Sequence, residues 1–433
     1  MTFSTPCWRT DPRSPSEGPE LNTDKRLDID FVRRQFPGLN TGWTFFDNAG
    51  GTQILSRSVD RMNDFLFNMN VQTGGSYDLS LRAAAAMQSG REAMMHFVNA
   101  SRPEEIAFAA STTVALQNLA RSMASQFAPG DEIIVTVSDH ESNIGPWVGL
   151  EDAGVKIKTW QLDKHSLELN VEDLQDLMTD RTRLVAVTFV SNILGTINPI
   201  AEIAKVVHDR GALICVDAVA YAPHRAIDVT ALDVDYLAFS LYKVFGPHFA
   251  VLYGKYDLFA ELDSLYHYFY GKDKIPAKLE PGNASYELGY SSIGIVDYLA
   301  ELAERAGQSG SMRQKIEFAF AQVTQHENLI AERLLKYLRS RSDTGIIGLA
   351  RGDDPRRVPT ISFVIEGRDP GEIARKIDPY NIAIRCGDFH ARRLIEYLDL
   401  ARGNGCVRVS MTHYNTLEET DALVAALDEV LAG

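Results

Sequence analysis

The stretch Phe239-Ser-Leu-Tyr-Lys-Val-Phe-Gly-Pro-His248 carries one lysine, Lys243, among apolar and aromatic residues. It lies between two predicted strands, Tyr236–Phe239 and Ala250–Tyr253, and contains a Gly-Pro turn. Burial without a partner disfavours an ammonium ion and lowers its pKa, which prepares an amine to form a Schiff base. The alternative is that Lys243 extends its charged end to solvent from the end of the strand.

Around this lysine, short β-branched runs alternate with amphipathic helical runs from Pro103 to Tyr253. This alternation predicts an α/β fold with a seven-stranded, mostly parallel sheet covered by helices. One predicted helix follows Ser111-Thr-Thr113, and another runs from Ile200 to Val207 and stops at Gly211. The other five predicted strands are Ile106–Phe108, Ile133–Val137, Val155–Trp160, Leu184–Val190 and Leu213–Val216.

The chain divides into four predicted parts: a disordered leader over residues 1–21, a segment over 22–44 that packs on the small domain, a large domain over 45–302, and a smaller α+β domain over 303–433. The segment over 22–44 contains a helix-like pattern at Asp28–Phe36. The smaller domain is predicted to hold a helix over Glu317–Leu338, strands at Thr360–Ile365 and Ile382–Arg385, and a closing helix. A capping box, Thr416 with Glu419, begins that last helix.

Composition excludes several classes of protein. The 433 residues are 45% hydrophobic and 23% charged, as in ordinary globular proteins. The net charge of −15 disfavours nucleic acid and anionic lipid as partners. We find no unbroken apolar run long enough to span a membrane. Four scattered cysteines without CxxC pairing predict a reducing, cytoplasmic location, and we predict no metal site.

Polar residues follow several predicted strands at the edge where open α/β sheets bind ligands. Asp217 ends one strand, Asn192 and Thr196 follow a second, and His140 follows a third. Ser111-Thr-Thr113 opens a helix whose free N–H groups suit a phosphate. Each residue alone is typical of a cap, a turn or a structural histidine. Together they supply an amine, an acid for a ring nitrogen, a ring for stacking and a phosphate site, which are what pyridoxal phosphate (PLP) requires.

At these residues the sequence resembles the class V aminotransferase family of fold-type I PLP-dependent enzymes, most closely the cysteine desulfurases and cysteine desulfurase-like proteins. The resemblance runs from about Phe31 to the C-terminus. Besides the lysine segment, the motifs that carry it are Phe45-Phe-Asp-Asn-Ala-Gly-Gly-Thr52, Gly130-Asp-Glu-Ile-Ile134, Asp139-His-Glu-Ser-Asn-Ile-Gly-Pro-Trp147 and Val190-Ser-Asn-Ile-Leu-Gly-Thr-Ile-Asn-Pro199.

The resemblance implies a role for each matching residue. Lys243 would form the Schiff base and move the Cα proton, Asp217 would pair with the pyridine nitrogen, and His140 would stack on the ring. Arg385 would bind the substrate carboxylate, and a homodimer is implied because a second subunit reaches the phosphate. The remaining implied cofactor contacts are Asn192, Thr112, Thr113, Ser240, Tyr242 and the partner's Asn283, and the remaining implied substrate contacts are Asn48 and Ala49.

Two departures from the family pattern affect the predicted reaction. Ala218-Val-Ala220 stands where the desulfurases usually place a glutamine near the cofactor hydroxyl. His390 stands where one subgroup holds its nucleophilic cysteine, so His390 is a candidate acid–base catalyst or substrate contact; the alternative is an ordinary loop histidine. Cys386 directly follows Arg385 and, in a strand, should face the opposite side. His224 and His248, both beside prolines, are predicted to be structural.

The expected function is therefore a PLP-dependent enzyme that acts on a cysteine-like amino acid and cleaves its carbon–sulfur bond, as a desulfurase or a β-lyase. An epimerase or aminotransferase-like enzyme of specialised metabolism is one alternative. A PLP-binding scaffold without catalytic activity is another.

Overall fold

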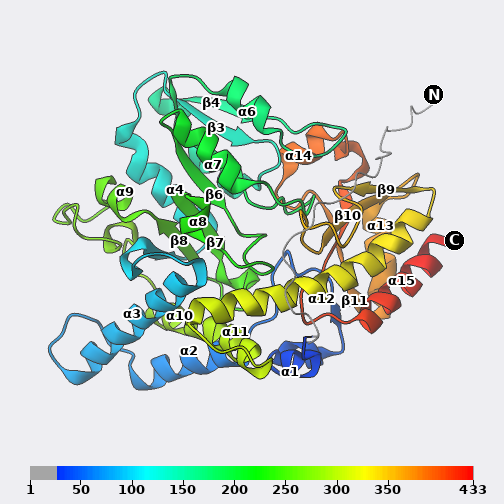
Figure 1. Cartoon of the computed structure of the whole chain (residues 1–433), viewed down its shortest axis with the longest axis horizontal. Coiled ribbons are helices and arrows are strands. Elements are labelled where there is room, and N and C mark those ends of the chain that lie inside the picture. Colours follow the sequence, from blue (N-terminus) through cyan, green and yellow to red (C-terminus); the bar gives the residue numbers. More distant parts are fainter. Residues whose placement is uncertain (1–26, 433) are drawn as a thin grey trace.

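The computed structural model describes residues 27–432, so the predicted leader over 1–21 and the first residues of the segment over 22–44 lie outside the described residues. Figure 1 shows a large sheet on one side of the molecule and a smaller sheet, with its helices, on the other. Within residues 27–432, none of the helices is long and apolar enough to cross a membrane.

The large sheet has seven strands in the order β2-β8-β7-β6-β5-β3-β4. β8 runs antiparallel to both of its neighbours, and the other neighbouring strands are parallel. This confirms the predicted fold class, and each predicted strand coincides with an observed one to within two residues. The observed strands are β2 (Ile106–Ala109), β3 (Glu132–Thr136), β4 (Lys156–Trp160), β5 (Thr182–Thr188), β6 (Leu213–Asp217), β7 (Tyr236–Ser240) and β8 (Ala250–Gly254).

Helices cover both faces of this sheet because successive strand residues point to opposite sides. In β3, Ile133 packs in the cluster that contains Leu116 of α4 (Thr112–Met123), whereas Ile134 packs in the cluster that contains Val207 of α7 (Ile200–Asp209). The remaining helices of this half are α2 (Ser56–Asn68), α3 (Asp78–Val98), α5 (Gly145–Val148), α6 (Val171–Leu177), α8 (Val229–Leu232), α9 (Tyr256–Glu261), α10 (Tyr286–Ser291) and α11 (Ile293–Arg305).

The smaller sheet is antiparallel, with the order β12-β13-β10-β9, and packs against α12, α13 and α15. The capping box is formed as predicted, with 3.1 Å bonds in both directions between Thr416 and Glu419. The elements of this half are β9 (Thr344–Ile347), β10 (Thr360–Ile365), β11 (Ile382–Ala383), β12 (Arg385–Gly387), β13 (Cys406–Ser410), α12 (Met312–Ser340), α13 (Pro370–Ile377), α14 (Arg392–Tyr397) and α15 (Leu417–Ala432).

The single strand predicted over Ile382–Arg385 was wrong. The chain instead forms two short strands in different sheets: β11 pairs in parallel with β1 (Thr44–Phe45), and β12 pairs with β13. The change of partner at Ile384 lets an N-terminal strand add to this region, a long-range pairing that local periodicity does not reveal.

The N-terminal helix α1 (Ile29–Arg34) contacts both halves of the protein. Arg33 donates to the Tyr414 carbonyl at 2.7 Å and pairs with Glu419 at 2.8 Å, whereas Phe31 stacks with Tyr298 of α11. The predicted domain boundary at Leu302 falls inside α11, which continues to Arg305. Through these contacts, α1 connects α11 with the C-terminal part of the smaller half.

Candidate active site

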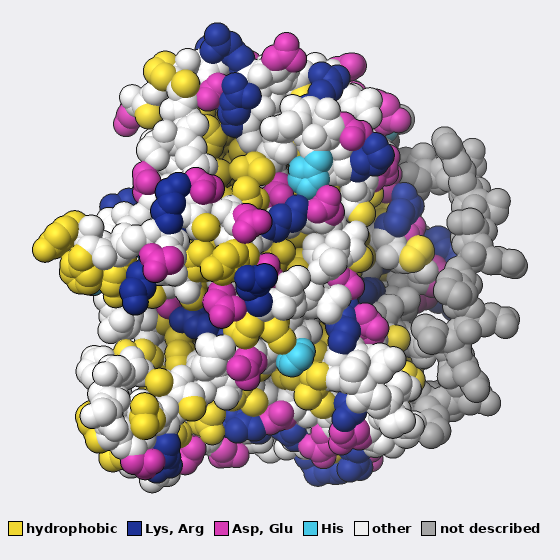
Figure 2. Space-filling model, turned by 60° about the vertical axis from the view of Figure 1, so that its left-hand side comes forward, with side chains coloured by type: hydrophobic (Ala, Val, Ile, Leu, Met, Phe, Trp, Pro, Cys, Tyr) yellow, Lys and Arg dark blue, Asp and Glu magenta, His cyan; other side chains and the backbone are white. Residues whose placement is uncertain are grey.

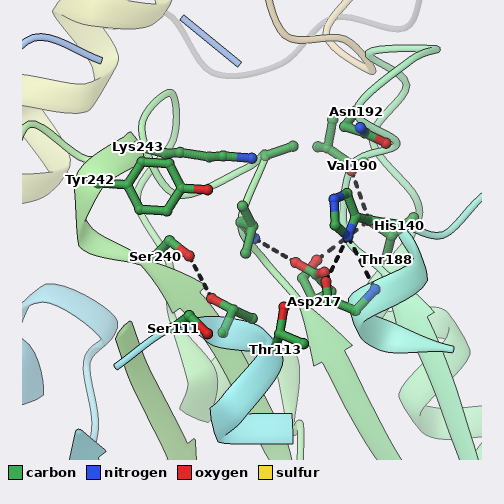
Figure 3. Close-up of a pocket in the computed structure, with 14 residues that line it drawn as sticks. Ser111, Thr113, His140, Thr188, Val190, Asn192, Asp217, Ser240, Tyr242 and Lys243 are labelled. Atoms are coloured by element: carbon green, nitrogen blue, oxygen red, sulfur yellow. Dashed lines mark hydrogen bonds between the residues drawn. The ribbon is translucent and has the colours of Figure 1, made fainter. Parts of the chain in front are cut away.

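The carboxyl ends of the large sheet's parallel strands form a pocket with about 490 Å³ of empty space, part of it open to solvent. This is the edge at which open α/β sheets bind ligands. Figure 3 shows the side chains converging from several elements. With the exception of Asn283, all the predicted cofactor-binding residues line it: Thr112, Thr113, His140, Asn192, Asp217, Ser240, Tyr242 and Lys243.

Lys243 follows β7 in a short 3-10 helix and is only 8% exposed, so it does not extend to solvent. Burial and the charge of Arg408 lower the pKa of the Lys243 amine. Asp217 ends β6 and is also buried. Burial raises the pKa of its carboxyl group, opposed by a 2.8 Å bond from the Val219 N–H and by the Lys243 charge. A reactive amine and a carboxyl group thus lie in one desolvated pocket.

The start of α4 lines the pocket with groups that suit an anion. Ser111 caps the helix by accepting a 3.2 Å bond from the Val114 N–H. The first N–H groups of a helix have no partner within it and carry the positive end of its dipole. The Thr112 and Ser240 hydroxyls lie beside them, 2.6 Å apart. Among the described residues lining this pocket, Lys243 is the one cation, so a phosphate would be held by N–H and hydroxyl groups.

His140 lies across the pocket from Lys243 (Figure 3). Its Nδ1 accepts a 3.1 Å bond from the Ser142 N–H, which leaves the proton of the neutral ring on Nε2. Burial and the Lys243 charge lower the pKa of His140 to about 3. A ring that is neutral at physiological pH suits stacking on an aromatic cofactor without repelling a nearby cation.

Asn192 and Tyr242 complete the predicted cofactor contacts. The Asn192 amide donates to the Phe389 carbonyl at 2.9 Å, and its Oδ1 is buried with no partner among the described residues. Because Asn192 lines the pocket, a ligand hydroxyl is a candidate donor to this orphaned acceptor. Tyr242 stacks on His248, with ring centroids 4.6 Å apart, so His248 is structural in this position.

The predicted substrate contacts Arg385, Asn48, Ala49 and His390 are absent from the lining of this pocket. Arg385 is half-exposed and pairs with Asp47 at 3.4 Å. The Asn48 amide donates to three protein oxygens, including the Ser410 carbonyl at 2.9 Å, and the Ala49 N–H donates to the Ser410 hydroxyl at 2.8 Å. The polar groups of Asn48 and Ala49 are thus engaged in fixing β13.

Sequence reasoning missed Arg408, a buried arginine of β13 that is 2% exposed. It pairs with Asp47 at 3.1 Å, and its guanidinium carbon lies 3.8 Å from the Phe389 ring centroid. The charge of Arg408 lowers the pKa of Lys243 and of His140, so Arg408 acts on these groups electrostatically although, like Arg385, it does not line the pocket. A charged residue inside an otherwise apolar strand, Cys406-Val-Arg-Val-Ser410, was the signal that could have revealed it.

The described cysteines lie away from the pocket. Cys215 is in the core of the large sheet, and Cys406 is buried in β13. The Cys386 sulfur lies on the side of β12 that faces Gly371 of α13, where burial raises the pKa of its thiol. Cys386 therefore points away from Arg385's partner Asp47, as strand alternation predicts. Cys7 lies outside the described residues.

A buried lysine, a carboxyl group at a central strand end, a neutral histidine and a helix N-terminus define the site of a fold-type I PLP-dependent enzyme, and these residues fit that cofactor's amine, pyridine and phosphate requirements. Residues 44–277 and 303–423 match the aminotransferase class-V family. The chain belongs to this family, whose members are PLP-dependent enzymes that act on amino acids.

Two curated relatives cover nearly the whole chain. It is 41% identical over 412 residues to the "Aminotransferase-like protein FGM3" of Gibberella zeae, covering 93% of this chain and 98% of that protein. It is 32% identical over 425 residues to the "Cysteine desulfurase-like protein ustD" of Aspergillus flavus, covering 95% and 92%. Both relatives therefore align across both sheets.

Among solved structures, the chain is similar to the apo cysteine desulfurase of Thermococcus onnurineus NA1, with a TM-score of 0.83 and 25% identity over 95% of this chain and 99% of that one. It is also similar to the cysteine desulfurase CsdA of Escherichia coli, with a TM-score of 0.80, 25% identity, and coverage of 94% and 99%. The predicted family and fold are confirmed.

Proposed function

We propose that this enzyme binds pyridoxal 5'-phosphate through Lys243 and cleaves the carbon–sulfur bond of a cysteine-like amino acid by elimination. The observation that carries the choice of elimination is the chemistry of the pocket lining: it holds a base and an acid, and none of the described cysteines lines it. Persulfide transfer needs a thiol at the sulfur, whereas elimination needs only a base and a path for the leaving group.

We assign the residues that line the pocket separate roles in holding the cofactor. The Thr112 and Ser240 hydroxyls and the first N–H groups of α4 would hold the phosphate, with Thr113 and Tyr242 beside them. Asp217 would pair with the pyridine nitrogen, and His140 would stack on the ring. When bound, the cofactor supplies an electron sink for charge that develops at Cα.

Other residues are proposed to bind the amino acid substrate and to accept its Cα proton. Arg408, together with the more exposed Arg385, binds the α-carboxylate, for which a guanidinium fork is suited. Lys243, whose pKa is lowered by burial, accepts the Cα proton. The Cβ–S bond then breaks and the sulfur leaves with its electron pair. For cysteine plus one water, the balanced products are sulfide, pyruvate and ammonia.

Product analysis tests this proposal. Holoenzyme incubated with L-cysteine and with S-substituted cysteines is expected to release pyruvate, ammonia and sulfide or the thiol in equal amounts. Alanine with protein-bound sulfur would contradict elimination and indicate a desulfurase that uses a cysteine. Lys243→Ala is the matched inactive control.

Amino transfer or epimerisation is the second candidate, favoured by the relative that is 41% identical and is named aminotransferase-like. The same assay distinguishes it: amino transfer consumes a keto acid and yields no ammonia, and epimerisation inverts Cα without breaking a bond to sulfur. A visible absorption band that does not shift with any amino acid would instead indicate a PLP-binding scaffold.

We further propose a homodimer in which the segment Glu280–Asn283 reaches the partner's phosphate site. Glu280 is buried in a bidentate pair with Arg91, at 2.8 and 2.6 Å, which fixes the base of this segment, whereas Asn283 is exposed and outside this chain's own pocket. Large hydrophobic side chains are exposed on neighbouring elements, including Phe67 at 81% and Tyr268 at 97%. Figure 2 shows hydrophobic side chains exposed on this side of the molecule.

A further inference from the structure

We propose that Glu141 and Arg393 are positioning residues: their ion pair is a clasp that holds the loop over residues 387–391 against the pocket and so fixes three groups of the site at once. The inference rests on the proposed function for the identity of those groups. It assigns a role to two residues that do not line the pocket.

The clasp joins segments that lie far apart in the sequence. Glu141 directly follows His140, and Arg393 lies in the first turn of α14, directly after the loop. The Arg393 Nε and Nη2 each donate to one Glu141 oxygen, both at 3.1 Å, which is the bidentate geometry that orients both partners. The Glu141 N–H also donates to the His390 carbonyl at 2.8 Å, so side chain and backbone hold the same loop.

The loop has a conformation that needs such restraint. Phe389 and His390 both have positive φ angles, of 51° and 59°, and neither is glycine. Two consecutive left-handed residues are unfavourable for side chains with a Cβ, so the surrounding contacts must stabilise them. The Asp388 carboxylate contributes by accepting a 3.1 Å bond from the His390 N–H.

From this loop, contacts reach three groups of the site. The Phe389 carbonyl holds the Asn192 amide, and the Phe389 ring lies against the Arg408 guanidinium. The His390 ring lies 5.3 Å from the His140 ring, centroid to centroid. If the loop moves, the cofactor contact Asn192, the carboxylate ligand Arg408 and the wall formed at His140 move with it.

This arrangement also gives His390 a defined place. It is exposed and outside the pocket, and its ring lies beside the His140 ring, at the position where one subgroup of the family holds its nucleophilic cysteine. None of the described cysteines lies within residues 387–391, so the clasp holds a loop that carries no thiol.

The test compares Arg393→Gln with Arg351→Gln. Arg351 forms an exposed bidentate pair with Asp353 in a loop away from the site, at 3.0 and 2.8 Å, so Arg351→Gln is a matched control for loss of one surface ion pair. Both substitutions lie on the surface, and we expect both variants to fold. A third variant, Glu141→Arg with Arg393→Glu, restores the pair with its charges exchanged.

Three readouts apply to the full-length holoenzyme: amide hydrogen exchange over residues 386–393, the visible absorption spectrum, and the apparent Kd for L-cysteine measured by the change in that spectrum. We expect Arg393→Gln to speed exchange in the loop, to alter the spectrum through Asn192, and to raise the Kd about fivefold, the factor that corresponds to loss of about 1 kcal/mol. Arg351→Gln should change none of the three, and the exchanged pair should recover most of the effect.

Two results would overturn the proposal. Loop exchange in Arg393→Gln equal to that of wild type would mean that the ion pair does not hold the loop. Faster exchange with an unchanged spectrum and Kd would mean that the loop does not position the site. Hydrogen exchange and the ligand-free spectrum do not depend on the reaction, so they test the clasp even if the proposed elimination is wrong.

Discussion

The hydroxyl groups of Thr112 and Ser240 lie 2.6 Å apart, although 128 residues separate them in the sequence. Thr112 is the first residue of α4, and Ser240 is the last residue of β7. Because β8 pairs between β7 and β2, the strand before α4, the sheet order sets the distance between these hydroxyls. The proposed phosphate site is therefore a consequence of the fold and needs no cluster of basic residues.

Ser240→Ala should weaken binding of pyridoxal 5'-phosphate about tenfold, because one hydrogen bond to a charged group is worth about 1.5 kcal/mol or more. Binding of pyridoxal, which lacks the phosphate, is the control and should change little. Fluorescence titration of the apoprotein measures both constants. An equal loss for both ligands would place Ser240 outside the phosphate site.

Arg408→Lys should reduce the affinity for an amino acid more than Arg385→Lys does. Arg408 is buried and held by Asp47, whereas the Arg385 side chain is 53% exposed. Water can therefore replace more of the hydrogen bonds that a lysine fails to make at position 385 than at position 408. We expect KM to rise by at least about tenfold for Arg408→Lys and about threefold for Arg385→Lys. Steady-state kinetics measure this, with thermal unfolding and cofactor absorption as controls for folding. The opposite order would make Arg385 the main carboxylate ligand.

His413 should make the protein less stable in acid. It is buried against the Tyr298 hydroxyl, 2.6 Å from Nε2, and burial with nearby histidine charges lowers its pKa to about 3. Below the ordinary value of 6.5, the unfolded chain binds a proton that the folded protein does not. The free energy of unfolding therefore decreases as the pH is lowered from 6.5 toward 3.

His413 alone should lower the free energy of unfolding by about 2 kcal/mol between about pH 7.5 and about pH 5. His413→Gln keeps a partner for Tyr298 and should show a correspondingly flatter pH dependence. Urea unfolding at several pH values provides the comparison. Identical slopes for the two proteins would mean that His413 takes up a proton while folded.

Tyr268→Asp should shift the protein toward a monomer, because it places a charge on a 97% exposed aromatic position in the proposed dimer surface. Tyr380→Asp, at a 39% exposed tyrosine of the smaller half, is the control. Light scattering after size exclusion gives the mass, and a titration gives cofactor affinity. Unchanged mass for Tyr268→Asp would remove this surface from the proposed interface.

Local sequence patterns were enough to predict the large sheet. Its central strands are short, continuous apolar runs, and Thr360–Ile365 in the small sheet has the same character. The site residues at the strand ends could also be predicted from the sequence, because the topology of a parallel sheet brings the carboxyl ends of its strands to one edge. Asp217, His140 and Lys243 met in the pocket for that reason.

Residues whose positions depend on long-range strand pairing could not be predicted from local sequence patterns. Arg408 reaches the site only because β13 pairs with β12 and because Asp47 comes from a distant N-terminal segment. Asn48 and Ala49 belong to a family motif, but the structure uses their polar groups to fix β13. The motif therefore identified the correct segment of the chain, but it did not identify which of its polar groups are free to bind a substrate.

Borohydride reduction of the freshly isolated, cofactor-saturated protein, followed by peptide mapping, tests the central claim most directly. We predict a pyridoxyl phosphate group on the peptide that contains Lys243, with loss of that label in Lys243→Ala. Labelling of any other lysine in the wild-type protein, or none at all, would contradict the assignment of Lys243 as the residue that holds the cofactor.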